Sequence, residues 1–370
     1  MIPFVLLSYF SSFSILGIKF GYILRAIILL TLLFYSAKHC LRLRKLDVQL
    51  SLVLIIASIP SLRYLFVEEW LTYVFNITFI IFFSAYVKKN LKTSVKRFIV
   101  VSTFLHVIIL LGFVPESGIK YSLEVFLINA NMYSGFLERP HITGFVSSYV
   151  VVAALECLKA DSSSLKNKLI YVLVLIVNIY VIYLTFARTA WLMLVLILLK
   201  ELYTQRRNIV SWVVGLSLIL GSYVILDFSS VIMRLSEKTL HNSSGNLTGN
   251  GRLNFWKGYL EIFYEMSWIN KLFGVSPSQA QTYLVNSYSL NYEAHNFFIT
   301  QLVGYGLVGL ILYLLLFVRF KMNQGFTSLL LFFWLFFQGT MGLEVFVTHI
   351  LITFFLYESK KPAFSDDFKY

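Results

Sequence analysis

The sequence has little charge and almost no cysteine. Asp, Glu, Lys and Arg together make up 13% of its 370 residues, and only 18 residues are acidic. So little charge excludes a soluble globular domain. The two cysteines, Cys40 and Cys157, both fall at predicted cytoplasmic helix ends, so neither a disulfide nor a metal site is expected. The amino terminus has no basic n-region and no small-residue cleavage site, so its first apolar run is expected to be a retained span.

Most residues of the chain are apolar. They make up 58% of the chain, and the mean hydropathy is +0.76. Apolar runs near the length that crosses a ~30 Å hydrocarbon core recur along the sequence. We therefore expect an all-α polytopic membrane protein of about twelve transmembrane helices, with residues 1–370 as a single membrane domain. The expected spans are 2–18, 20–37, 48–66, 70–87, 98–114, 141–158, 169–186, 189–203, 209–226, 295–318, 326–343 and 345–357.

Most of the 31 Lys and Arg residues cluster in alternate connections between these spans. By the positive-inside rule those connections face the cytoplasm, as do both termini, which predicts a multi-pass protein of the bacterial inner membrane. The net charge of +13 is therefore a topological signal, and no nucleic-acid partner is expected. The connections that carry the basic residues are 38–45, 88–97, 159–168, 200–207, 319–321 and 360–369.

This topology leaves one large extracytoplasmic loop, residues 227–294, and a smaller one, 115–140. Long loops in compact proteins are usually functional or disordered. The large loop contains a Gly/Asn/Ser run at 242–251, which indicates a mobile lip. Its apolar residues lie partly at helical spacing, so an ordered amphipathic segment at the membrane interface is expected. They are Trp256, Tyr259, Ile262, Phe263, Trp268 and Phe273.

His295 follows the large loop, where the chain re-enters the membrane. Freed N–H groups and the helix dipole favour the neutral imidazole there, which can act as a base. The alternative is an interfacial histidine satisfied by water. Arg188, between two apolar runs, and Arg252, after two glycines, are candidate phosphate ligands because a guanidinium binds phosphate bidentately. Their alternatives are a snorkelling residue at a tight hairpin and an ordinary loop cation.

A fourth cluster, Glu138-Arg139-Pro140-His141, ends the smaller loop. Pro140 suits the first position of a helix. The three ionisable residues can bind a sugar or phosphate, or pair with one another as a structural cap. Gly304, Gly306 and Gly309 resemble part of a dinucleotide fingerprint, but they lie in an expected span, which favours close packing through small residues.

Three of these segments together resemble the O-antigen polymerase / O-antigen ligase superfamily. They are Ala294-His295-Asn296 continuing to Gly306-Leu307-Val308-Gly309, the Phe186-Ala187-Arg188-Thr189-Ala190 segment, and Gly251-Arg252 with Trp256. Residues 135–141 also resemble a segment of related polymerases, except that Arg139 is inserted between Glu138 and Pro140. That insertion leaves the role of Glu138 open.

The resemblance implies a GT-C-type membrane glycosyltransferase that needs neither metal nor cofactor. Its donor and acceptor would be oligosaccharides on undecaprenyl diphosphate, with a chain-length regulator as a possible further partner. His295 would be the catalytic base, and the substrate would be bound by Arg188, Arg252, Glu138, Arg139, His141 and Asn296. The outer face shows no Asp-x-Asp motif and no His/Cys ligand set.

Three functions fit to different degrees. A polymerase for O-antigen or capsule is favoured, because the loops are small and no protein-docking domain is evident. A ligase that transfers the glycan to lipid A-core or protein is the alternative within the superfamily. A flippase or other transporter should show a two-half repeat and polar residues in mid-span. The sequence shows no such repeat, and its polar candidates Arg25, Asn76 and Asn178 are scattered.

Overall fold

The computed structural model describes residues 14–15, 18–19, 93–113, 120–123, 130–137, 140–160, 165–185, 187–204, 252–288, 294 and 296–319. Most of these residues are helical, as expected for an all-α membrane protein. Two short antiparallel ribbons are the exception: β1 (Ser14–Ile15) pairs with β2 (Ile18–Lys19), and β3 (Lys120–Leu123) pairs with β4 (Ala130–Tyr133). The described residues of the expected span 2–18, which are Ser14, Ile15 and Ile18, are therefore extended and not helical. The second folds the predicted loop 115–140 back on itself.

Four helices form a bundle in the middle of the chain. They are Thr93–Leu110, α5 (Pro140–Ala160), α6 (Leu165–Thr185) and α7 (Arg188–Thr204). Each matches an expected span to within about five residues, which agrees with the accuracy of sequence-based boundaries. By length and composition, three described segments can cross a membrane: Thr93–Leu110, Pro140–Leu158 and Leu165–Thr185. The expected spans 20–37, 48–66, 70–87, 209–226, 326–343 and 345–357 lie outside the described residues.

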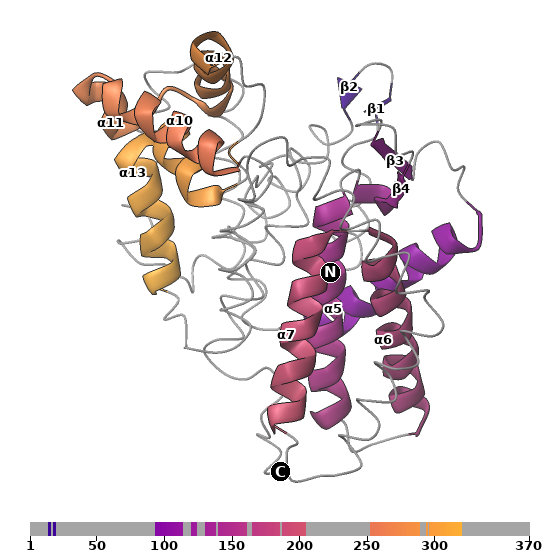
Figure 1. The fold of residues 1–370 in the computed structure, drawn as a ribbon. Coiled ribbons are helices and arrows are strands. Elements are labelled where there is room, and N and C mark those ends of the chain that lie inside the picture. Colours follow the sequence, from indigo (N-terminus) through magenta and orange to yellow (C-terminus); the bar gives the residue numbers. More distant parts are fainter. Residues whose placement is uncertain are drawn as a thin grey trace.

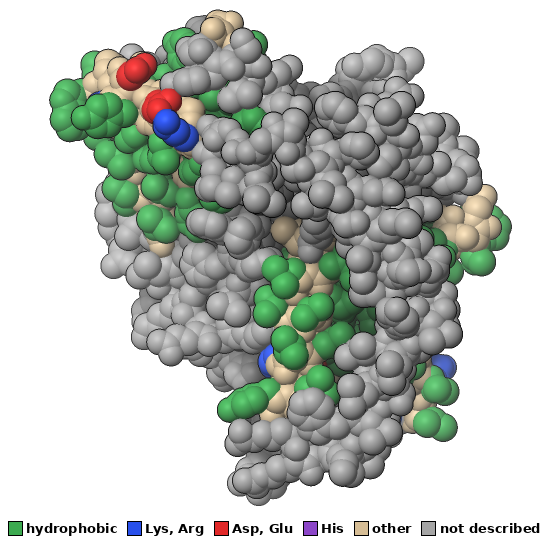
Figure 2. Space-filling view, viewed as in Figure 1, with side chains coloured by type: hydrophobic (Ala, Val, Ile, Leu, Met, Phe, Trp, Pro, Cys, Tyr) green, Lys and Arg blue, Asp and Glu red, His purple; other side chains and the backbone are tan. Residues whose placement is uncertain are grey.

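Helix α5 is the centre of this bundle. Its residues from Ile142 to Ala154 are buried throughout, and small residues on it let neighbouring helices approach closely. Phe98 of the first helix packs edge-on against Tyr149 of α5, with ring centroids 6.0 Å apart. The outer helices expose apolar side chains instead, such as Leu192, Val195 and Leu199 of α7. Figure 2 shows hydrophobic side chains in the region of α7, as expected for a surface that meets lipid.

Helices α10 (Arg252–Glu265), α11 (Trp268–Phe273) and α12 (Pro277–Tyr288) form from the predicted large loop. The helical segment expected there is therefore present, although its depth relative to the membrane stays a prediction. These helices pack on α13 (Phe297–Arg319), the helix that follows the loop. Their shared core is apolar and contains Tyr259, Ile262, Val275, Ala280, Leu284, Ala294 and Val303.

Helix α13 is broken at Gly306, whose φ of 70° and ψ of −172° are not helical. The connection between α11 and α12 packs against this break through backbone atoms. The amides of Val275 and Ser276 donate to the carbonyls of Val303 and Gly304, at 3.3 and 2.9 Å. A Cβ added at Gly306 would lie 2.4 Å from the carbonyl oxygen of Leu272. Close packing through small residues is thus confirmed here, but its partner is the loop backbone rather than another span.

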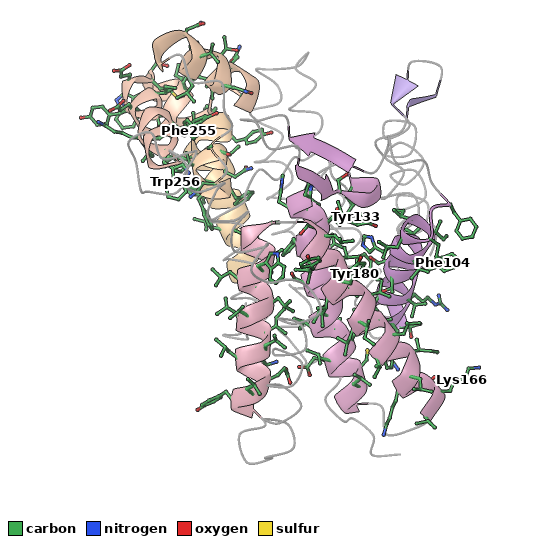
Figure 3. The ribbon with its side chains drawn as sticks, turned by 45° about the vertical axis from the view of Figure 1, so that its right-hand side comes forward. Phe104, Tyr133, Lys166, Tyr180, Phe255 and Trp256 are labelled. Carbon is green, nitrogen blue, oxygen red and sulfur yellow. The ribbon has the colours of Figure 1, made fainter. Side chains whose placement is uncertain are left out.

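The elements divide between the two ends of the molecule as the predicted topology requires. The ribbons β1–β2 and β3–β4 and helices α10–α12 all lie at the upper end in Figure 1. Lys166, from a connection predicted to be cytoplasmic, lies at the end of the bundle opposite to Tyr133 of β4 (Figure 3). The side of the membrane that each end faces stays a prediction from the charge distribution.

Candidate functional site

The turn before α13 carries the motif that contains His295. Asn296 is the N-cap of α13: its side-chain oxygen accepts from the amide of Ile299 at 3.2 Å, and its carbonyl accepts from the amide of Thr300 at 3.0 Å. The Asn296 side chain is buried, with 2% of the residue exposed. Its observed role is therefore to start the helix, and its predicted substrate contact stays a prediction. His295 itself lies outside the described residues.

Trp256 ties α10 to this turn. The indole Nε1–H donates to the carbonyl of Ala294, which is 1% exposed, with a nitrogen–oxygen distance of 2.7 Å. Trp256 lies one helical turn after Arg252, the first residue of α10. The hydrogen bond therefore holds the start of α10 beside the backbone that carries His295, across 38 residues of sequence. Only the backbone of Arg252 is described.

The start of α7 belongs to a second cluster. Arg188 is the first residue of α7, and its side chain is not described. The turn before it is held by Thr185, whose hydroxyl accepts from the amide of Ala187 at 3.4 Å. Gly144 of α5 lies directly against this turn, because a Cβ added there would be 2.6 Å from the Cβ of Ala190. The Arg188 segment is thus set against the first turns of α5.

The segment before α5 is held just as closely. The hydroxyl of Thr143 donates to the carbonyl of Ser134, and the phenol of Tyr133 is 3.0 Å from Nδ1 of His106. The ring of Tyr133 also lies 3.4 Å from the position of a Cβ on Gly135, whose φ is +56°. Residues Gly135–Leu137 then form the short 3₁₀ helix η2.

The cluster at the end of the smaller loop is described in part. Pro140 is the first residue of α5, as its capping preference predicts. His141 follows it in the first turn, with its side chain half-buried. Glu138 and Arg139 lie outside the described residues, so their predicted roles stay predictions.

The sequence reasoning missed a layer of buried polar side chains inside the bundle. Asn178 of α6 donates to the hydroxyl of Thr103 on the first helix at 2.8 Å, and also to the carbonyl of Val174 at 2.8 Å. Asn178, one of the polar residues that are scattered in the sequence, therefore has a polar partner on another helix of the bundle. Ser102, Thr103 and His106 share a helical face, and that spacing was the available signal. The buried polar residues of the bundle include Ser102, Thr103, His106, Thr143, Ser147, Ser148, Asn178 and Thr185.

The predicted site residues fall into two groups of packed elements. Helix α7, with Arg188, packs on α5 and α6, whereas α10, with Arg252, packs on α12 and α13. The structure therefore joins the Arg252–Trp256 segment to the His295 turn, and it joins the Arg188 segment to the start of α5. Figure 3 shows the first pair around Trp256 and the second on the bundle near Tyr133. That all of these residues share one pocket stays a prediction.

The comparison with protein families bears on the same stretch of chain. A family model described as O-antigen ligase matches residues 172–314. The match begins inside α6, contains Arg188, Arg252, Trp256 and His295, and ends in α13. The segment 135–141 lies outside it. The comparison with curated proteins gave no match. Residues 172–314 are therefore similar to the O-antigen ligase family, which supports the resemblance to the O-antigen polymerase and ligase superfamily.

Proposed function

We propose that this protein is a surface-polysaccharide polymerase, working on the outer face of the bacterial cytoplasmic membrane. It joins repeat units that are carried on undecaprenyl diphosphate, to build O-antigen or a capsule-type polymer. The observation that supports this most directly is the bond from Trp256 to the carbonyl of Ala294, at 2.7 Å. It joins two segments that lie within the matched residues at the start of α13, the helix that follows the predicted extracytoplasmic loop.

The reaction is a direct displacement at the anomeric carbon of the donor glycan. His295 removes the proton from an acceptor hydroxyl, whose oxygen then bonds to the anomeric carbon. The bond from that carbon to the diphosphate oxygen breaks, and the electron pair leaves with the lipid diphosphate. Attack opposite to the leaving group inverts the anomeric centre.

The guanidinium groups of Arg188 and Arg252 meet the negative charge that grows on the leaving diphosphate. A diphosphate is already a good leaving group, so fixed cations are enough to stabilise it. The proposed mechanism therefore uses no metal or cofactor. Asn296, which follows His295 in the sequence, contributes by capping the start of α13. The multispan scaffold is of the GT-C type, and the cytoplasmic ends of the spans carry both termini.

The test is to replace His295 with alanine in cells and to separate the surface glycan on a gel. His295→Ala should insert normally but give only single-repeat product, because no base remains to activate the acceptor. His241→Ala, a histidine of the same predicted loop, is the matched control and should give full-length polymer. Normal long chains in His295→Ala would overturn the assignment of the base.

A ligase is the second candidate, because the matched family is described as O-antigen ligase. The same gel separates the two functions when the whole gene is deleted. Loss of a polymerase leaves core carrying one repeat, whereas loss of a ligase leaves naked core. Arg188→Lys should impair either enzyme, since one ammonium cannot replace a bidentate guanidinium.

A further inference from the structure

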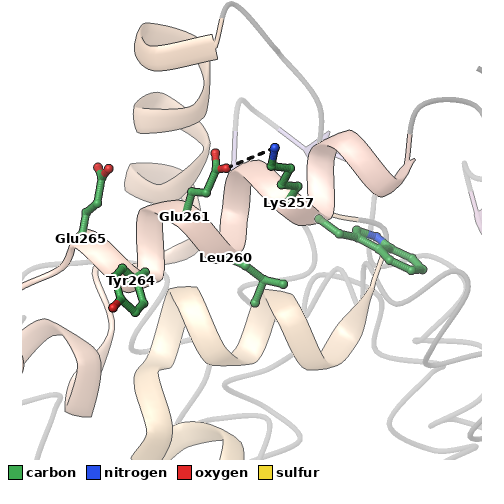
Figure 4. A pocket seen from close by; sticks show the side chains of 6 residues that line it. Lys257, Leu260, Glu261, Tyr264 and Glu265 are labelled. Atoms are coloured by element: carbon green, nitrogen blue, oxygen red, sulfur yellow. Dashed lines mark ion pairs between the residues drawn. The ribbon is translucent and has the colours of Figure 1, made fainter. Parts of the chain in front are cut away.

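We infer that the exposed side of α10 is a glycan-binding groove that guides the sugar chain to and from the His295 turn. This inference rests on the proposed function. The groove has a volume of about 480 Å³, and six side chains of α10 line it (Figure 4). They are Trp256, Lys257, Leu260, Glu261, Tyr264 and Glu265.

The six residues form two parallel ridges along one helix. Trp256, Leu260 and Tyr264 are four residues apart and make an apolar ridge, because residues i and i+4 lie one above the other. Each of the other three lies one position later, so a charged ridge, 257–261–265, runs beside the first. On the charged ridge, Lys257 and Glu261 are 3.7 Å apart, and the Lys257 side chain is 77% exposed.

This pairing of ridges fits the chemistry of a sugar ring. A pyranose presents C–H groups on its faces and hydroxyl groups around its edge. The aromatic and aliphatic ridge can cover the C–H face, while the carboxylates accept hydrogen bonds from hydroxyls and the ammonium donates to them. Mostly apolar walls with a few polar groups that fix orientation are typical of small-molecule sites.

Tyr264 is the groove residue of the apolar ridge that lies farthest along α10 from Trp256. Tyr264 is 81% exposed, which leaves its side chain accessible to a ligand. The ammonium of Lys271, from α11, lies 5.2 Å from the Tyr264 ring centroid and 5.8 Å from that of Trp268. This cation–π pairing restrains the ring from the α11 side.

The groove begins where the candidate chemistry is. Trp256 at its inner end donates to the carbonyl of Ala294, the residue before His295. From Trp256 to Tyr264 the helix rises by about 12 Å. A glycan whose end lies at the His295 turn therefore has a lined path along α10 away from that turn.

Charge favours a glycan over a lipid surface as the occupant. A membrane rich in anionic lipids attracts basic segments. The groove has no cluster of basic residues, because the carboxylates of Glu261 and Glu265 are matched by the ammonium of Lys257, paired with Glu261, and by that of Lys271 beside Tyr264. Such a balanced surface lacks the basic excess that attracts anionic headgroups, whereas its carboxylates and ammonium groups can bond to sugar hydroxyls.

The test measures binding of lipid-free oligosaccharides, released by mild acid from the surface glycan of the producing cells, to the full-length protein in detergent. Tyr264→Ala should weaken binding by about fivefold or more, as expected when an aromatic anchor is truncated. Tyr264→Phe should bind normally because the ring remains. Tyr283→Ala, an exposed tyrosine of α12 outside the groove, is the matched control and should also bind normally. Unchanged affinity in Tyr264→Ala overturns the inference.

A second measurement separates the groove from the proposed function. His295→Ala should retain oligosaccharide binding while losing chain elongation, and Tyr264→Ala should shorten the chains in cells. If His295→Ala elongates normally while Tyr264→Ala still loses binding, the catalytic proposal fails and the groove stands. Lipids brominated at headgroup depth quench the fluorescence of a tryptophan that they contact. If they quench Trp256 in a variant that keeps only this tryptophan, and added oligosaccharide does not reduce the quenching, the groove faces lipid and the inference is overturned.

Discussion

The bundle around α5 and the assembly of α10–α13 are held together by different means. In the bundle, side chains make the contacts between helices: Phe98 packs on Tyr149, and Asn178 bonds to Thr103. In the assembly, side chains form an apolar core, but backbone also meets backbone, because Val275 and Ser276 donate directly to carbonyls of α13. Gly274 and Gly306 permit this approach, both at positive φ.

Because of this difference, the two regions should tolerate amino-acid substitutions to different degrees. A side-chain contact in a bundle can be weakened by degrees, since neighbouring side chains repack around a smaller group. A backbone contact through glycine has no such freedom, because any side chain collides with main-chain atoms. We therefore expect graded effects in the bundle and abrupt effects where the loop meets α13.

The largest effect is expected at the glycine contact. Gly274→Ala would place a Cβ 2.1 Å from the carbonyl oxygen of Gly304, and the residue would also keep a φ of +77°. The clash with main chain should cost about 3–5 kcal/mol of unfolding free energy, in the range of severe core substitutions. Thermal unfolding of the protein in detergent measures the loss.

Gly112→Ala is the control for this substitution. Gly112 has the same φ of +77°, but nothing lies within 4 Å of an added Cβ. It should therefore show the conformational cost alone, about 1–2 kcal/mol. Equal losses in the two variants would show that the backbone contact between the loop and α13 adds nothing.

Trp256→Phe tests the hydrogen bond that joins α10 to the His295 turn. The ring is kept, but the buried carbonyl of Ala294 loses its indole donor, which should cost about 1–3 kcal/mol. Polymer formation should fall by about 10- to 100-fold, because a small displacement of a catalytic group is costly. Initial rates of chain growth in membranes measure the loss of polymer formation. Trp268→Phe, with 76% of the tryptophan exposed, should change neither quantity.

Asn178→Leu removes an interhelical hydrogen bond from the bundle while keeping the branched shape and the number of heavy atoms in the side chain. The loss should be about 0.6–2 kcal/mol, the range found for such bonds between membrane helices. A double-mutant cycle with Thr103→Val, measured by unfolding in mixed micelles, isolates the pair. Additive losses would mean that Asn178 and Thr103 do not stabilise the bundle through each other.

The smallest effect is expected at the ion pair on the surface of α10. Lys257 and Glu261 are 3.7 Å apart, and the two side chains are 77% and 39% exposed. Lys257→Gln should change the unfolding free energy by only about 0.3 kcal/mol, because water and salt screen such pairs. A loss comparable to that of Asn178→Leu would contradict this ranking.

The bundle and α13 were predictable because membrane thickness imposes a length on apolar runs. The boundaries of α5, α6, α7 and α13 fell close to the expected spans, and Pro140 marked the start of α5. The motif residues were also found from the sequence, since their order and type are local properties. Their catalytic and binding roles stay predictions.

What escaped prediction depends on partners far apart in the chain. Trp256 was noticed as a motif residue, but its bond to Ala294 spans 38 residues, and that from Asn178 to Thr103 spans 75. The break at Gly306 was equally hidden, because glycine in an apolar run is compatible with both an intact and a broken helix. Residues 14–15 read as part of an apolar span, yet they pair with 18–19 as a ribbon.

The break in α13 has a consequence for biogenesis. Lipid offers a main-chain carbonyl no alternative partner, so a discontinuous span is costly to insert alone. Val303 and Gly304 obtain their donors from Val275 and Ser276, which the ribosome makes earlier. The segment that completes the last described helix is thus synthesised before that helix, so under the predicted topology the loop must be translocated before the helix can insert with its carbonyls paired.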